Sequence, residues 1–225
     1  MSEWWTYRLS DFLLFSADTY YRLFELYNTA IWPAHIVVLV LSGLWFYFLI
    51  RPKPWSGKLL FTFLGTTWLW IAWGYHVSHF TSVNWAASYY AIGFALEGLL
   101  LILAGGSGKA RPIPSNTHWT SRVGTGLIGF GLILQPLIVL LSGRPWTQIE
   151  LFALAPDPTV IATLGILLLV GRIRWLLLPI PIIWCLISSA TLWTMGASEF
   201  WMTLCAAGVA LFAVRPVHKK PYSVY

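Results

Sequence analysis

Long apolar runs, separated by short polar segments, follow one another along most of the chain. Seven runs have the composition of buried or membrane helices, and they cover Ile31–Ile50, Leu59–His79, Trp85–Ala104, Val123–Ser142, Pro158–Val170, Trp175–Met195 and Glu199–Val214. A helix needs about 20 apolar residues to cross roughly 30 Å of hydrocarbon. The pattern predicts an all-α, polytopic bundle of seven transmembrane spans over residues 31–214. The fifth run is short and reaches a spanning length only with Ala153–Ala155 and Gly171.

The first 30 residues have a different pattern, in which apolar side chains gather on one side of a polar segment. This apolar side contains Trp4, Trp5, Phe12, Leu13, Tyr20, Leu23 and Phe24. Ser10 and Ser16 are each placed to cap a short helix, and Arg22 lies one turn before Glu25. We interpret residues 1–30 as amphipathic helices that lie in the membrane interface. Residues 215–225 form a basic tail.

The basic residues are distributed in a way that predicts an orientation. Eleven of the fourteen follow the first, third, fifth and seventh runs, and they are Arg51, Lys53, Lys58, Lys109, Arg111, Arg122, Arg172, Arg174, Arg215, Lys219 and Lys220. Cytoplasmic loops of membrane proteins are enriched in Lys and Arg. The sequence therefore predicts an external N-terminus and a cytoplasmic C-terminus, and this alternation requires an odd number of spans.

Composition agrees with a lipid environment. Hydrophobic residues make up 58% of the 225-residue chain and charged residues 10%, whereas a soluble domain carries about 25% charge. The net charge of +6 lies in short loops between apolar runs, so we expect the lipid bilayer and no nucleic acid as a partner. Cys185 and Cys205 fall within apolar runs and are expected to be small buried residues.

Prolines, glycines and one asparagine mark structural positions. Pro136, which follows Gln135, and the pair Pro179 and Pro181 are expected to kink the fourth and sixth runs. Small residues of the fourth run permit a close helix approach or a subunit interface, and they are Gly124, Thr125, Gly126, Gly129 and Gly131. Asn84 is placed to cap the third run.

The chain contains a weak internal repeat. Pro158 opens the fifth run, which resembles the first run in its start and in the basic residues that follow it. Such a three-plus-one-plus-three arrangement is typical of small carriers.

Three histidines are predicted near the outer face. His35 and His76 lie roughly 6 and 5 Å below the outer ends of the first two runs, at 1.5 Å per residue, and His79 shares a helix face with His76. Imidazoles at one depth are ligands for a transition metal or a haem iron, and Met195 and Met202 would add soft ligands. The same residues also fit a proton or solute path, or interfacial histidines bonded to headgroups, water and backbone. The pattern leaves these alternatives open.

Glu97 is the one carboxylate placed deep within a predicted span, roughly 18 Å from its outer end. Tyr90 shares its helix face, Thr66 and His76 share a face of the preceding run, and Gln135 lies in the fourth. Together these residues predict a polar seam, since ionisable groups within a membrane are expensive and mark functional positions. The alternative is that Glu97 acts only as a hydrogen-bond donor between helices.

Three segments resemble an uncharacterised family of bacterial integral-membrane proteins with a domain of unknown function. They are RLSDFLLFSADTYYRLFELYNTAIWPAHIV, FTSVNWAASYYAIGFALEGLLL and ALAPDPTVIATLGILLLVGRIRWLLLPIPIIWCLISSA. The resemblance implies a multi-pass protein of the bacterial inner membrane and implies no activity. The family tends to Cys at the position of Asp157 and to Gln at that of Glu97, so it does not imply that either carboxyl group is essential.

Motifs of the common enzyme classes are absent from the sequence. It contains no H-E-x-x-H, no P-loop and no paired catalytic carboxylates, and the last run has no lysine for a retinal. These absences favour a protein without catalytic activity. Three functions remain open, namely a non-catalytic subunit or scaffold of a membrane complex or homo-oligomer, a small-solute or ion carrier, and a haem- or metal-binding protein.

Overall fold

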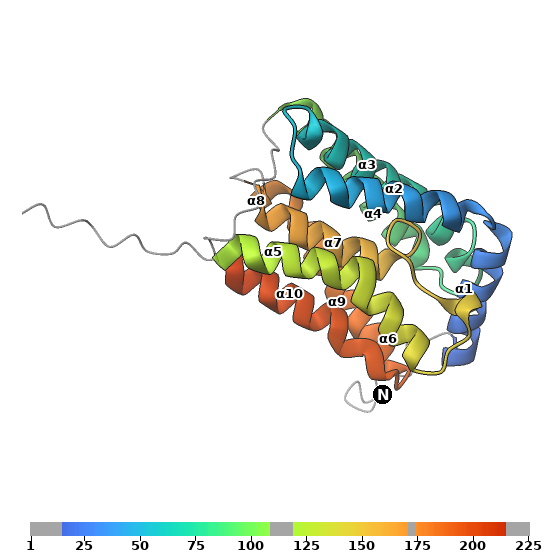
Figure 1. Cartoon of the computed structure of the whole chain (residues 1–225). Coiled ribbons are helices and arrows are strands. Elements are labelled where there is room, and N and C mark those ends of the chain that lie inside the picture. The colour runs from blue at the N-terminus through green and yellow to red at the C-terminus, as the bar shows by residue number, and fades with distance from the viewer. Residues whose placement is uncertain (1–14, 109–118, 171–173, 215–225) are drawn as a thin grey trace, which may run out of the picture.

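The computed structural model describes residues 15–108, 119–170 and 174–214, which are helical without a strand, as the all-α prediction expects. The α-helices are α1 (Ala17–Ala30), α2 (Ala34–Ile50), α3 (Ser56–Trp70), α4 (Ala87–Gly106), α5 (Trp119–Gly129), α6 (Gln135–Leu141), α7 (Pro156–Leu168), α8 (Arg174–Leu177), α9 (Pro179–Thr194) and α10 (Trp201–Val214). Wider π-helical turns form η3 (Ile71–Val77) and η5 (Phe130–Leu134), and 3-10 turns form η4 (Phe80–Ser82), η6 (Trp146–Gln148) and η7 (Ser198–Phe200). The helices form a bundle, with α1 across one end (Figure 1).

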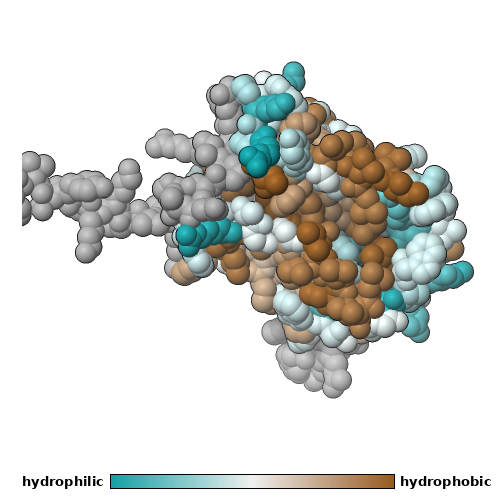
Figure 2. Space-filling model, viewed as in Figure 1, coloured by the Kyte–Doolittle hydropathy of each residue, from teal (hydrophilic) through white to brown (hydrophobic). Residues whose placement is uncertain are grey.

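Three helical stretches of the described residues are long and apolar enough to cross a membrane. They are Ala87–Gly106, Trp119–Leu141 and Arg174–Thr194. Helices α1 and α2 meet the same test only as a pair bent by 89°, and α7 and Ser198–Val214 are apolar but shorter. Length and composition thus identify three or four of the seven predicted spans. Figure 2 shows hydrophobic residues over the middle of one face and hydrophilic residues toward both ends of the bundle.

Helix α7 is the core of the bundle. All thirteen of its residues are buried, and it packs against α5, α9, α10 and α3. Helix α2 has the opposite environment, since it buries only four of its seventeen residues. The first and fifth apolar runs, which a three-plus-one-plus-three repeat would make equivalent, therefore lie in different surroundings.

Glycines allow two helix pairs to approach closely. A Cβ atom on Gly165 of α7 would lie 2.6 Å from the carbonyl oxygen of Gly124 of α5, and the reverse distance is also 2.6 Å. Gly65 of α3 and Gly98 of α4 face each other in the same manner. Of the fourth run, Gly124 and Gly131 contact α7, whereas a Cβ atom on Gly126 or Gly129 would meet open space.

The expected N-terminal helix is present as α1. Ser16 caps it by accepting a hydrogen bond from the Thr19 backbone N–H at 3.2 Å, and Arg22 pairs with Glu25 on its exposed side. Its buried face includes Phe24, which stacks on Tyr75 of η3 at 5.0 Å. The expectations for Ser10 and the basic tail lie outside the described residues.

The prolines interrupt their runs less than expected. The π-helical turn η5 ends directly before Gln135-Pro136, and Trp119–Leu141 continues as one helix because the wider turn accommodates the missing proline N–H. Pro179 and Pro181 lie in the first turn of α9, where a missing N–H costs no helical hydrogen bond.

Cys185 is buried as predicted, but Cys205 is exposed on α10 because it faces away from the bundle.

Candidate functional site

The chain enters α7 from inside the bundle. Residues 151–155 form a turn closed by hydrogen bonds from the Leu154 and Ala155 N–H groups to Leu151 O, at 3.1 and 2.8 Å. Within it, the Phe152 ring lies 5.3 Å from the ring of Trp45, which is eleven residues into α2 and so roughly 16 Å from the start of that helix. Helix α7 thus begins near half the height of the bundle. It begins at Pro156 because a residue before proline is restricted to extended conformations, and Ala155 has φ −107° and ψ 150°.

Side chains satisfy the non-helical backbone of this turn. The Tyr27 hydroxyl donates to Leu154 O at 3.0 Å. The Thr159 hydroxyl accepts from the Ala153 N–H at 2.8 Å and donates to Ala155 O at 2.7 Å. Ala153 has a φ of 71°, a left-handed conformation that is costly for a residue with a Cβ atom. The turn is therefore a specified feature that the surrounding side chains hold in place.

Asp157 lies in the first turn of α7, with 3% of its surface exposed. Its carboxylate accepts hydrogen bonds from Trp184 Nε1 at 2.8 Å and from the Ser188 hydroxyl at 2.6 Å. Both partners lie on one face of α9, roughly 15 and 9 Å before the end of that helix. The first turn of a helix also favours a negative charge through the helix dipole. The carboxylate is thus well bound, although it is deep in the bundle.

His76 completes this group of residues. It has no exposed surface, and both its ring nitrogens lack a hydrogen-bond partner among the described residues. Its ring lies 4.6 Å from that of Phe94 and 5.1 Å from that of Trp184. It belongs to the π-helical turn η3, a kind of distortion that is frequent at functional sites. We call Asp157, Trp184, Ser188 and His76 the α7 cluster, because Trp184 contacts both of its ionisable groups.

A charged network lies between the α7 cluster and the end of the bundle covered by α1. Arg144 pairs with Glu150 at 3.3 Å and with Glu199 at 3.9 Å. Its guanidinium also lies 4.0 Å from the centre of the Tyr21 ring of α1. Burial raises the pKa of Glu150 from an ordinary value near 4.5 to about 7, and Arg144 opposes this rise. Glu150 therefore titrates near neutral pH.

We expect a Glu150→Gln variant to lose part of the pH dependence of stability. The raised pKa means that the folded chain binds the Glu150 proton more tightly than the unfolded chain. The stability that this proton contributes is complete below about pH 4.5 and is lost as the pH rises through 7. The melting temperature of the variant relative to the wild type should increase from pH 5 to pH 8 in detergent. Glu25→Gln, in the more exposed pair with Arg22, is the control for loss of a carboxyl group near the surface. A flat difference for Glu150→Gln would contradict the assignment.

The three predicted histidines have different partners in the structure. His35 Nε2 donates to Asn28 Oδ1 at 3.2 Å, and His79 Nδ1 donates to Gly74 O at 2.8 Å. His76 lies among aromatic rings instead. Met195 is half-buried and Met202 is buried. Within the described part of the chain, no group of three His, Cys, Asp or Glu residues is arranged to hold a metal ion.

The residues of the predicted polar seam differ in burial and in their partners. Glu97 is fully buried on α4, and both its carboxyl oxygens lack a partner among the described residues. Gln135 is buried at the start of α6, where its Oε1 also lacks a partner. Tyr90 lies 6.1 Å from His76, ring to ring. Thr66 is exposed, and its hydroxyl donates to Thr62 O within the same helix.

The three positions predicted to be structural have local roles. Asn84 Oδ1 accepts from the Ala86 N–H at 3.0 Å, just before α4 begins at Ala87. Pro136 is buried in the first turn of α6. Pro158 is buried in the first turn of α7, where its carbonyl approaches Gly131. These contacts shape the helix ends near the site.

Sequence reasoning misses most of the α7 cluster and its charged network. It places Asp157 and Glu150 in an outer segment, and it assigns no role to Arg144, Trp184 or Ser188. A signal is present, because the fifth run is too short to span alone and is preceded by the apolar LFALAP segment. Such a segment indicates a loop that returns into the bundle and carries its polar neighbours inward. The cluster offers a bound carboxylate, an imidazole without a described partner and an aromatic wall between them.

Comparison with known proteins places the chain in a family but supplies no activity. No curated protein and no solved structure matches it. A family model matches residues 17–221, which include all the described helices, and its description is a family of unknown function (DUF6064). The expected resemblance to an uncharacterised family is thereby confirmed. The chain belongs to the DUF6064 family of unknown function.

Proposed function

We propose that this protein is a multi-pass protein of the bacterial plasma membrane, with seven spans, an external N-terminus and a cytoplasmic C-terminus. The alternation of the basic segments supports this topology. The start of α5, the end of α10 and the short α8 lie at the end of the bundle opposite α1 (Figure 1). Helix α7 is about 20 Å long at 1.5 Å per residue, so the fifth span would consist of α7 and the turn at residues 151–155.

Within this topology we propose a carrier for a small polar solute or ion, coupled to protons. The observation that carries this proposal is the start of α7 inside the bundle, next to Asp157 and His76, whose ring nitrogens have no described partner. Interrupted helices that begin near the middle of the bilayer form the binding sites of many secondary transporters. Irregular backbone is tolerated at that depth only inside protein or beside a cavity. The turn at residues 151–155 includes Ala153 in a costly left-handed conformation deep in the bundle. A functional role would explain why the chain keeps this turn.

The chemistry of the α7 cluster fits a coupled proton. The Asp157 carboxylate is held by two donors that a competing cationic group of a solute would displace. Neither ring nitrogen of His76 bonds to another described residue, so a solute that reached it would not have to displace a partner. Glu97 of α4 supplies a further fully buried carboxyl group. These groups would exchange protons with a solute in the interior.

Charge movement in reconstituted membranes tests this proposal. Proteoliposomes adsorbed on a solid-supported electrode are exposed to amino acids, amines, carboxylates and sugars at pH 5.5 and 7.5. We expect at least one class to evoke a current, and we expect Asp157→Asn and His76→Phe to abolish it, because each removes a proton-binding group. Glu25→Gln is the matched control on the surface. Absence of current across the panel, or equal currents in the wild type and Asp157→Asn, would overturn the carrier.

A subunit or scaffold is the second candidate, and the exposed face of α2 favours it. Large apolar side chains cover this face with 49–60% of their surface exposed, and they are Ile36, Val37, Leu39, Val40 and Leu44. Gly43 lies on the same helix with no atom close to its Cβ position. Such a face suits a neighbouring helix, because small residues let backbones approach. Cysteine cross-linking from Val40→Cys in native membranes, with Leu103→Cys on α4 as the control, would detect a partner there.

A further inference from the structure

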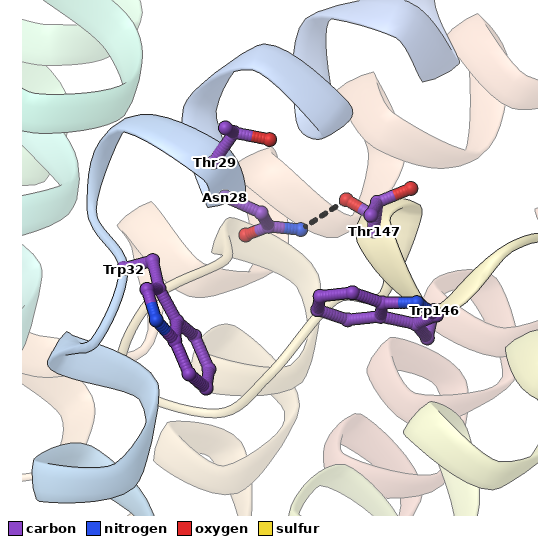
Figure 3. Close-up of a pocket in the computed structure, with 5 residues that line it drawn as sticks. All are labelled: Asn28, Thr29, Trp32, Trp146 and Thr147. Atoms are coloured by element: carbon purple, nitrogen blue, oxygen red, sulfur yellow. Dashed lines mark hydrogen bonds between the residues drawn. The ribbon is translucent and has the colours of Figure 1, made fainter.

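A small cavity opens where the bend between α1 and α2 meets the turn η6. Its volume is about 230 Å³, and it is lined by Asn28, Thr29, Trp32, Trp146 and Thr147. Figure 3 shows the two indole rings below the side chain of Asn28, one from each of the two segments. Pockets for drug-sized ligands begin at about 300 Å³, so this cavity suits a single small group. We call it the Trp pocket.

The walls of the Trp pocket are two aromatic rings at a steep angle. The rings of Trp32 and Trp146 have centroids 6.5 Å apart and planes inclined by 71°. Both side chains are well exposed, at 56% and 68% of their surface. A group entering the corner between them would contact both rings. Neither ring is needed to fill the core, so this arrangement is open to a ligand.

Two polar side chains of the pocket, Asn28 and Thr29, are already engaged with the protein. Asn28 Nδ2 donates to Thr147 O at 2.8 Å and to Ile149 O at 2.9 Å, and Asn28 Oδ1 accepts from His35. The Thr29 hydroxyl donates to Glu25 O at 2.7 Å. A sugar or an amino acid would need several hydrogen bonds here, and these groups have few to offer. The pocket therefore suits a group that binds through its surface and makes no hydrogen bonds.

Charge near the pocket does not oppose a cation. Arg144 reaches this region through its hydrogen bond to Gln148 O, next to Thr147. Its guanidinium pairs with the carboxyl groups of Glu150 and Glu199. A cation between two indoles is attracted to their electron-rich faces, and tryptophan is the strongest aromatic partner for such a contact.

We propose that the Trp pocket binds a quaternary ammonium group through cation–π contacts with Trp32 and Trp146. Such a group has a positive charge and an apolar surface and cannot donate a hydrogen bond from its nitrogen, which matches the walls and the engaged polar atoms. Its source is either a soluble compound such as choline or a choline headgroup of a lipid. This inference is independent of the proposed carrier, because it uses none of the residues of the α7 cluster.

Calorimetric titration of the full chain in a maltoside detergent tests this site. The probes are choline and 3,3-dimethyl-1-butanol, which has the same shape without the charge. We expect choline to bind and the neutral alcohol to bind at least about tenfold more weakly, since only the charge adds a cation–π contact. Trp32→Ala and Trp146→Ala should each weaken choline binding about tenfold, and Trp146→Phe should weaken it less.

Trp85→Ala is the matched control, because Trp85 is also an exposed tryptophan, at 67%, and lies just before α4. Melting temperatures of all variants show whether each has folded. A second titration uses dodecylphosphocholine below its micellar concentration in place of choline. Binding of choline supports a soluble ligand, and binding of the phosphocholine amphiphile alone supports a lipid headgroup. The proposal is overturned if neither binds, if the neutral alcohol binds equally, or if Trp85→Ala weakens binding as much as Trp146→Ala.

Discussion

Replacing Gly165 by alanine should destabilise the protein severely. The new Cβ atom would lie 2.6 Å from Gly124 O, 2.7 Å from Ile128 Cγ1 and 2.9 Å from Ile128 N. Two of these atoms belong to the backbone of α5, so the contact is relieved only if the helices move apart. Overpacking of a core costs about 1–3 kcal/mol, and we expect about 3 kcal/mol because α7 is buried on every side. The melting temperature of the detergent-purified protein and its yield as a monodisperse species measure the effect.

Gly126→Ala is the matched control on the neighbouring helix. A Cβ atom at this position has no atom within 4 Å, and alanine favours a helix by about 1 kcal/mol over glycine. The control should therefore be as stable as the wild type or slightly more stable. If the two alanine variants melt at the same temperature, the close crossing of α5 and α7 is not a feature of the folded protein.

Replacing Asp157 by alanine should also produce a large loss of stability. The change leaves Trp184 Nε1 and the Ser188 hydroxyl without their acceptor in the interior. A buried polar group without a partner costs about 1–3 kcal/mol, and with two such groups we expect a loss of roughly 3 kcal/mol. The loss would be seen as a lower melting temperature. Asp157→Asn keeps an acceptor oxygen of the same shape and should lose less.

A double-mutant cycle with Ser188 distinguishes this hydrogen bond from simple loss of volume. Ser188→Ala removes one of the two donors to Asp157. If the bond between them stabilises the fold, the double variant should lose less stability than the two single losses added together. Additive losses would show that the two side chains act independently, contrary to the 2.6 Å contact.

The positions of the candidate functional residues are only partly predictable from the sequence. His76 and Glu97 stand out because ionisable residues are rare within apolar runs, and both are fully buried. Asp157 is predicted outside the bundle because it lies before the fifth run, in the outer segment between the fourth and fifth spans. Its true position depends on the turn at residues 151–155, which is held by Tyr27, 127 residues from its partner Leu154. Contacts of this range leave no local pattern in the sequence.

Local patterns in the sequence were enough to predict a helical chain and the places where most helices begin and end, because apolar periodicity and helix-capping residues are local properties. Which helices are interior depends instead on the packing of the folded chain. Helix α7 is buried on all sides and α2 is mostly exposed, although both are apolar runs. Lipid tails are as apolar as leucine side chains, so hydropathy does not distinguish a helix that faces lipid from one that faces protein. That distinction comes from close crossings, such as that of Gly124 and Gly165, which depend on residues far apart in the chain.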